Sequence, residues 1–166
     1  MIWHDINELV AHLHVLQNID QHCKIFTTSG GFDPIHVGHL RCIQETANMA
    51  TQCSSSKVII IVNGDGFLHR KKGYAFMSIE ERMEIISGIN GVDEVTTWDD
   101  GGQTVSGAIS LLRPHYFTKG GDRTDISNVP ENDACELVGC KIIFGVGGEK
   151  IQSSSNLVKN MGSQNR

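Results

Sequence analysis

Residues 30–40 read Gly-Gly-Phe-Asp-Pro-Ile-His-Val-Gly-His-Leu and follow the short run 24–29 (KIFTTS). The run predicts a β-strand, and the spacing of apolar residues over 37–51 predicts a helix directly after the motif. The free backbone N–H groups and partial positive charge of a helix start attract anions. His36 and His39 lie at this start. We therefore expect a polyphosphate site between the first long strand and the next helix.

Strand and helix patterns alternate along the rest of the chain. Further strands are predicted at 57–63, 92–98, 115–118 and 141–146, and further helices at 78–90, 104–112, 130–138 and 153–160. This alternation predicts an α/β fold with one parallel five-stranded sheet and helices on both faces. Ligands bind such sheets beyond the carboxyl ends of the strands, near the switch point. Because each motif below follows a predicted strand, we expect the motifs to converge there.

The N-terminal residues 1–23 are predicted to be a helical extension. Asp5 is suited to cap a helix over 5–20, whose apolar residues recur at helical spacing. We expect this helix to pack on a domain formed by residues 24–161. The tail 162–166 is expected to be flexible.

Composition argues against several classes of protein. The 166 residues suffice for one domain with a core, and the formal net charge of −5 argues against a nucleic-acid-binding face. No apolar run reaches the ~20 residues that span a membrane, and the first residues do not resemble a signal peptide, so we expect a cytoplasmic protein. The five cysteines are odd in number and include no Cys-x-x-Cys, which favours reduced thiols over disulfides or a metal site.

The motif at 30–40 has the residues that a phosphate site needs. Gly30 and Gly31 let the backbone approach a ligand, and Gly38 leaves room where a phosphate would come close. The two histidines are three residues apart and therefore share one face of a helical turn. Two surface histidines at a helix start are the alternative, and a zinc site lacks an evident third ligand.

Three further groups of residues follow later strands. The serines at 153–155 open the last predicted helix, where hydroxyls and free N–H groups would hold a second anion; a simple serine cap is the alternative. Segment 119–123 (KGGDR) suggests a polar substrate contact or a solvated turn. The basic loop 69–73 (HRKKG) could close over phosphates or stay solvated. Arg82 could reach the same region or pair with a nearby glutamate.

Together and in chain order, these motifs resemble the signatures of the HxGH nucleotidyltransferase superfamily over residues 24–160. Members transfer a nucleoside monophosphate from ATP or CTP to a phosphorylated small molecule and release pyrophosphate. The resemblance implies a Rossmann-like fold, Mg²⁺ bound with the nucleoside triphosphate, and direct in-line attack without a covalent intermediate. Phosphoryl-type transfer needs mainly positioning and charge stabilisation, which suits a chain rich in phosphate binders.

The resemblance also implies roles for individual residues. His36, His39 and Lys72 would be catalytic: the histidines would stabilise charge as pyrophosphate leaves, and Lys72 would neutralise the attacking and α-phosphates. Lys72, Arg82 and Arg123 would bind the acceptor substrate. The residues implied in nucleotide binding are Ser29, Gly30, Gly31, Phe32, Gly38, Lys119, Gly121, Asp122, Ser153, Ser154 and Ser155.

Within the superfamily the acceptor stays open. Segments 119–122 and 70–73 look most like heptose-1-phosphate adenylyltransferases, whereas 153–159 is similar to the serine-rich motif of pantetheine-phosphate adenylyltransferases. Glycerol-phosphate cytidylyltransferases carry an arginine in the Arg-Thr-Glu-Gly-Ile motif, and its absence here favours ATP. Members are often dimers, so a homodimer is expected by analogy.

Two functions of other classes remain as alternatives. The first is a nucleotide-binding regulatory module without activity, against which the intact His36 and His39 argue. The second is a dinucleotide-dependent oxidoreductase, which would need Gly-x-Gly-x-x-Gly after the first long strand. Residues 29–38 lack that pattern.

Overall fold

Six parallel strands form one sheet with the order β1-β4-β3-β2-β5-β6. The computed structural model describes residues 1–121 and 129–164. The strands are β1 (Ile2–Trp3), β2 (Lys24–Gly30), β3 (Ser56–Asn63), β4 (Glu94–Trp98), β5 (Tyr116–Thr118) and β6 (Lys141–Ile143). The α/β class and the parallel sheet are confirmed, but the sheet has six strands where the sequence predicted five.

The additional strand, β1, comes from the segment predicted to be only helical. Its two residues pair with β4, so that Ile2 lies opposite Val95 and Trp3 lies opposite Thr96. The buried carboxylate of Glu94 also accepts a hydrogen bond from Trp3 Nε1 at 2.6 Å. Two residues cannot show an alternating pattern, so no periodicity in the sequence indicates this strand.

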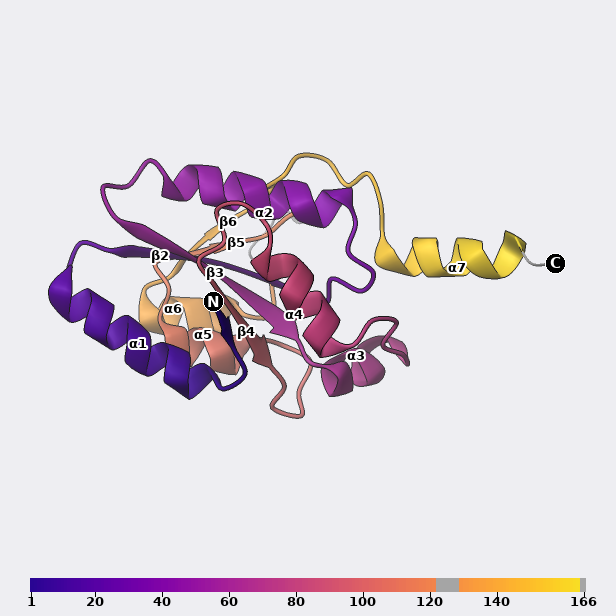
Figure 1. The fold of residues 1–166 in the computed structure, drawn as a ribbon, viewed down its shortest axis with the longest axis horizontal. Helices are drawn as coiled ribbons and strands as arrows, with labels where there is room; N and C mark the ends of the chain where they lie inside the picture. The colour runs from indigo at the N-terminus through magenta and orange to yellow at the C-terminus, as the bar shows by residue number, and fades with distance from the viewer. Residues whose placement is uncertain (122–128, 165–166) are drawn as a thin grey trace.

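Helices cover both faces of the sheet, as predicted. They are α1 (Ile6–Ile19), α2 (Val37–Ala50), α3 (Asp65–Lys72), α4 (Ile79–Ser87), α5 (Ser106–Leu112), α6 (Asn132–Val138) and α7 (Ser154–Gln164). Helices α1, α5 and α6 pack on one face and α2 and α4 on the other, while α7 projects from the body of the molecule (Figure 1). No described helix is both long and apolar enough to cross a lipid bilayer.

The isoleucine-rich strand β3 contributes to both cores. Ile59 and Ile61 face the helices α1, α5 and α6, whereas Val58, Ile60 and Val62 face α2 and α4. Successive side chains of a strand point to opposite sides of the sheet. A continuous apolar run is therefore what a central parallel strand needs when helices cover both of its faces.

Residues 69–73, which the sequence suggested were a loop, form the last turn of α3 and its C-cap. Gly73 ends the helix in the left-handed conformation (φ 87°), which glycine adopts without steric cost. The basic residues of the last turn are stabilised by the negative end of the helix dipole. Only Phe67 and Leu68 of this helix are buried, so its apolar pattern is too short to reveal it.

The strand order places a crevice at the carboxyl ends of β2 and β5. Strands β2, β3 and β4 follow one another to one side, and β5 and β6 lie on the other side of β2. This is the Rossmann-like arrangement, in which the connections after β2 and β5 diverge and leave room for a ligand. The motif at 30–40 follows β2, and the segment 119–121 follows β5.

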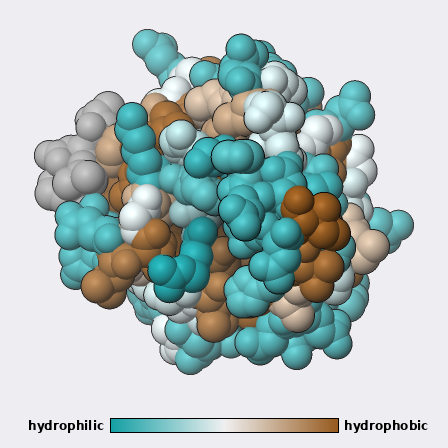
Figure 2. All heavy atoms as spheres, turned by 90° about the vertical axis from the view of Figure 1, so that its left-hand side faces the viewer, coloured by the Kyte–Doolittle hydropathy of each residue, from teal (hydrophilic) through white to brown (hydrophobic). Residues whose placement is uncertain are grey.

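The side of the molecule opposite α7 has a different character. Figure 2 shows that hydrophilic side chains cover most of this face, and that the hydrophobic ones lie in separate small areas. Scattered apolar side chains of this kind are normal on a protein surface. The cavity that could take a ligand lies elsewhere, at the carboxyl ends of the strands.

Candidate active site

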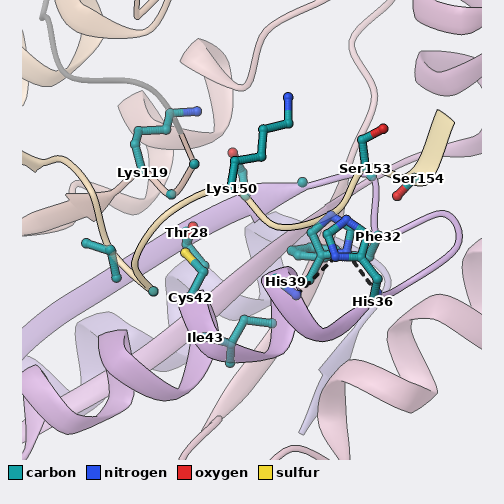
Figure 3. A pocket seen from close by; sticks show the side chains of 18 of the residues that line it. Thr28, Phe32, His36, His39, Cys42, Ile43, Lys119, Lys150, Ser153 and Ser154 are labelled. Carbon is teal, nitrogen blue, oxygen red and sulfur yellow. Dashed lines mark hydrogen bonds between the residues drawn. The ribbon is translucent and has the colours of Figure 1, made fainter. Parts of the chain in front are cut away.

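A cavity of about 370 Å³ lies at the carboxyl ends of β2 and β5 (Figure 3). Its walls come from the motif after β2, the start of α2, the segment after β5 and the β6–α7 loop (residues 144–153). The predicted site residues on these walls are Ser29, Gly30, Gly31, Phe32, His36, Gly38, His39, Lys119, Gly121, Ser153 and Ser154. Three chain segments that are far apart in sequence, the motif with the start of α2, the segment after β5 and the β6–α7 loop, thus meet at one cavity.

His36 and His39 stack on each other at the start of α2. Their ring centroids are 3.8 Å apart with an interplanar angle of 23°, and Phe32 lies edge-on to His39. His36 Nδ1 accepts a hydrogen bond from the Gly38 N–H at 3.1 Å, and His39 Nδ1 accepts one from the His36 N–H at 3.2 Å (Figure 3). The two rings form a capping box, a task usually performed by Ser or Thr with Glu or Gln.

These hydrogen bonds determine the tautomer of both rings. A ring nitrogen that accepts a hydrogen bond carries no proton, so the proton of the neutral imidazole is on Nε2. Burial lowers the pKa of His39 to about 4, with smaller effects from His36 and Lys72. Burial and the nearby Lys150 ammonium lower the pKa of His36. Near pH 7 both rings are neutral, and each has one N–H group, on Nε2, left to donate.

Asp33, inside the first motif, fixes the segment that follows α3. Its side chain is fully buried and accepts hydrogen bonds from the backbone N–H groups of Phe76 and Met77, both at 2.6 Å. Lys72 Nζ donates to the Asp33 carbonyl at 2.7 Å. Lys72 therefore lies beside the motif but not on the cavity wall, where its neighbour Lys71 lies instead.

Arg82 is part of the scaffold and not of the cavity wall. Only 1% of the residue is exposed, and its guanidinium donates to the carbonyl oxygens of Gly31 at 2.8 Å and Asn63 at 2.6 Å. It also forms an ion pair with Asp65. The expectation that Arg82 binds the acceptor stays a prediction; in this structure the side chain connects the ends of β2 and β3 to α4. Its place inside a helix, beside other charged residues, gave no sign of this burial.

The serines before α7 differ in position. Ser154 Oγ donates to the Pro34 carbonyl at 2.8 Å, and Ser153 Oγ accepts from the Asn156 N–H at 3.1 Å, so it caps the helix. Both line the cavity, whereas Ser155 is exposed and does not. The predicted site residues Asp122 and Arg123 lie outside the described residues.

The β6–α7 loop approaches α2 closely at Gly147. A Cβ on this residue would lie 2.7 Å from Cys42 N, and its φ of 89° is a conformation that only glycine adopts freely. The Gly147 N–H donates to the Glu45 carboxylate on α2. These contacts hold the loop over the cavity and place Lys150 on its wall (Figure 3).

Several wall residues were not among the residues predicted for the site. They are Thr28, Cys42, Asn63, Gln103, Glu131 and Lys150. Asn63 could have been suspected because it ends a buried strand, where ligands of parallel sheets bind. Glu131 could not, because it reaches the cavity only through the packing of α6 against α5.

The arrangement suits an anionic ligand and not covalent catalysis. Two Nε2–H groups, the starts of α2 and α7, and the Lys150 side chain meet at one cavity. Cys42 also lines it, but burial raises the pKa of its thiol, so it stays protonated near neutral pH and is a weak nucleophile. The cavity is therefore better suited to holding an anionic ligand by hydrogen bonds and charge than to nucleophilic attack by a side chain.

Comparison with known proteins gives related sequences. The cytidylyltransferase-like family matches residues 27–158. The bifunctional protein HldE of Hahella chejuensis is 30% identical over 128 residues, which are 76% of this chain and 24% of that protein. HldE of Aliarcobacter butzleri is 29% identical over 157 residues, which are 93% of this chain and 29% of that protein. The chain thus spans about a quarter of the length of these relatives.

A solved structure shares the fold. The lipopolysaccharide core biosynthesis protein from Thermoplasma volcanium matches with a TM-score of 0.60 at 18% identity, over 73% of this chain and 94% of that chain. The family match at 27–158 contains every residue of the cavity wall, from Thr28 to Ser154. The chain therefore belongs to the cytidylyltransferase-like family of nucleotidyltransferases.

Proposed function

We propose that this protein transfers the nucleoside monophosphate of ATP or CTP to the phosphate group of a small metabolite and releases pyrophosphate. The stacked, neutral pair of His36 and His39 carries this proposal. Its two Nε2–H groups are the donors that the capping box leaves unused, and they lie on the wall of an anion-binding cavity. Membership of the family supports the reaction type.

The geometry supports one assignment of the triphosphate. Its β- and γ-phosphates would lie at Ser153, Ser154 and the start of α7, and its α-phosphate beside the two imidazoles. An oxygen of the acceptor phosphate attacks the α-phosphorus, the bond from that phosphorus to the bridging oxygen breaks, and pyrophosphate leaves with the electron pair. The Nε2–H groups stabilise the charge that develops on the phosphate oxygens. The attacking phosphate is already an anion at neutral pH, so no side chain has to remove a proton from it.

We propose that Mg²⁺ enters with the triphosphate. This ion keeps several waters and is usually bound by substrate phosphates with one or two carboxylates. Among residues 1–121 and 129–164, no three His, Cys, Asp or Glu side chains are grouped so that they could hold a metal. Phosphate oxygens of the substrate and waters would therefore supply most of the ligands of the Mg²⁺ ion.

For the substrates, we propose ATP and a sugar phosphate. The likeness of 119–122 and 70–73 to heptose-1-phosphate adenylyltransferases supports both, as does the similarity to HldE proteins. The cavity wall near β3 suits the acceptor, because Asn63 Oδ1 is buried there without a hydrogen-bond partner among the described residues and Lys71 supplies a cation. An amide oxygen accepts from a hydroxyl, and an ammonium binds a phosphate.

A screen of nucleotides against acceptors tests the proposal. Pyrophosphate release is measured for ATP, CTP, GTP and UTP, each with sugar 1-phosphates, alcohol phosphates and phosphopantetheine. We expect ATP with a sugar phosphate to give the highest rate, and the His36→Ala and His39→Ala variants to lose it. Tight nucleotide binding without pyrophosphate release from any pair would contradict the proposal and favour a regulatory binding module.

A further inference from the structure

Glu131, at the N-cap position of α6, is a buried carboxylate on the cavity wall. Its side chain is only 7% exposed. One oxygen, Oε1, accepts a hydrogen bond from the Val105 N–H at 3.3 Å. The other oxygen, Oε2, has no hydrogen-bond partner among the described residues and lies 3.8 Å from Lys119 Nζ. That separation is longer than the about 2.7–2.9 Å of a charge-assisted hydrogen bond.

A buried carboxylate oxygen without a hydrogen bond is costly, and native proteins leave few such atoms. A ligand could complete the site, and its chemistry is limited because a carboxylate only accepts hydrogen bonds. The partner must therefore be a donor, such as a hydroxyl group. The triphosphate itself cannot be this partner, because its oxygens are acceptors and carry negative charge.

The position of Lys119 indicates which part of a nucleotide reaches Glu131. If the Lys119 ammonium meets the α-phosphate, the group next to Glu131 is the one bonded to that phosphate, which is the ribose. The surrounding wall agrees, because Val105 and Pro130 are apolar and suit a nucleoside more than a phosphate. Gly121 lines the same cavity, and among the described residues no atom apart from its chain neighbours lies within 4 Å of the place where its Cβ would be.

We propose that Glu131 accepts a hydrogen bond from a ribose hydroxyl of the bound nucleoside triphosphate, and so selects ribonucleotides over deoxyribonucleotides. This inference rests on the proposed function, since it needs a nucleotide in the cavity. In this arrangement Lys119, whose ammonium is 3.8 Å from Glu131 Oε2, would lie between the carboxylate and the phosphates, and its positive charge would offset their repulsion.

The test measures binding, without turnover, on the full chain. Dissociation constants are determined by calorimetry for ATP, 2′-deoxy-ATP and 3′-deoxy-ATP and for the same three forms of CTP. The proteins are the wild type, Glu131→Ala, Glu131→Gln and the matched control Glu136→Gln, an exposed carboxylate on the same helix. Thermal melts of each variant establish that it is folded.

We expect the wild type and Glu136→Gln to prefer a ribonucleotide over one deoxy form by about 10- to 100-fold, the effect of one hydrogen bond to a charged group. Glu131→Ala should bind both forms alike. Glu131→Gln keeps a carbonyl acceptor and should retain part of the preference, which also guards against misfolding of the alanine variant.

Two results would overturn the inference. The wild type could bind ribo and deoxy forms equally, or Glu131→Ala could keep the full preference. The second result is what a purely positioning role would give. If Glu131 only positioned Lys119, Glu131→Ala would weaken the binding of ribonucleotides and deoxyribonucleotides by the same factor. If no nucleoside triphosphate binds, the proposed function fails as well, whereas pyrophosphate release without a ribose preference overturns the role of Glu131 alone.

Discussion

At the scale of single residues, the histidine pair has two tasks that use different atoms. Nδ1 of each ring caps α2, and the Nε2–H of each ring is left to donate to a ligand in the cavity that both residues line. An alanine substitution removes both tasks at once and would confuse a weaker helix start with a lost phosphate contact. A substitution that keeps an Nδ1-like acceptor separates them.

We predict that His36→Ser keeps the fold but slows turnover. Serine accepts from the same backbone N–H groups, so the free energy of unfolding should change by less than about 1 kcal/mol. The missing Nε2–H donor should lower kcat by about 10²–10³-fold. Pyrophosphate release and urea unfolding measure the two effects, and His14→Ser on the exposed surface of α1 is the control. Near-normal turnover in His36→Ser would exclude that ring from the reaction.

The low pKa of His39 predicts how stability depends on pH. Its pKa is about 4 in the folded protein, against the usual value of 6.5 when the chain is unfolded. Between these values the unfolded chain binds the proton and the folded protein does not. The free energy of unfolding should therefore fall by about 3 kcal/mol from this group as the pH drops from 6.5 to 4.

Urea unfolding at pH 7, 5.5 and 4.5 measures this effect. His39→Asn lacks the titrating ring, so its stability should change less over the same range than that of the wild type. If the free energy of unfolding changed equally with pH in the two proteins, His39 would not be held in its neutral form.

At the scale of elements, the connections that hold the cavity are the buried polar residues Asp33 and Arg82. Each is bonded mainly to backbone groups of a neighbouring segment. The cavity is therefore shaped by the ends of β2, β3 and α4 acting together.

Arg82→Ala should be mainly a stability variant. It leaves the carbonyl oxygens of Gly31 and Asn63 without their donors and the Asp65 carboxylate without its partner, so we expect a loss of about 3 kcal/mol or more. Thermal and urea unfolding measure this loss. If Arg82→Ala kept the stability of the wild type and raised only the KM for the acceptor, Arg82 would be a substrate-binding residue.

The β6–α7 loop offers a matched pair of substitutions. Gly147 and Gly148 both have φ above +80°, so alanine is strained at either position. At Gly147 the new Cβ would lie 2.7 Å from the backbone nitrogen of Cys42, whereas at Gly148 it would have no atom of the described residues within 4 Å beyond its chain neighbours. Gly147→Ala should therefore weaken ATP binding more than Gly148→Ala. Equal effects in a calorimetric titration would show that the contact with α2 does not set the position of the loop.

At the scale of the whole molecule, the N-terminal segment belongs to the same core as the rest. Ile6, Leu9 and Leu13 of α1 are buried with side chains of β3 and α5, and β1 extends the sheet. Burying one such side chain contributes about 1.5–3 kcal/mol, so three of them approach the total stability of an ordinary domain.

A chain limited to residues 24–166 should therefore fail to fold stably. Far-ultraviolet circular dichroism and thermal melting of this fragment, beside the full chain, measure the outcome. A cooperative transition near that of the full chain would show that residues 1–23 form a separate extension.

Features that depend on local sequence patterns were predictable, and features that depend on contacts between distant segments were not. Long periodic segments, such as β3 and α2, and the motif that joins β2 to α2 were predictable because their patterns are local. The two-residue strand β1 and the polar helix α3 were not, because pairing and packing with distant segments stabilise them. The wall residues Glu131 and Asn63 reach the cavity only through the folded sheet.

Because the histidine pair caps the helix with one nitrogen of each ring and donates with the other, an inactive but folded variant can be designed. A chain with both His36→Ser and His39→Gln would carry the ordinary Ser-x-x-Gln box at the start of α2, so the helix could begin as before. It would also lack both imidazole donors. Such a protein would be folded but inactive, and a complex with both the nucleotide and its acceptor bound could be isolated before they react.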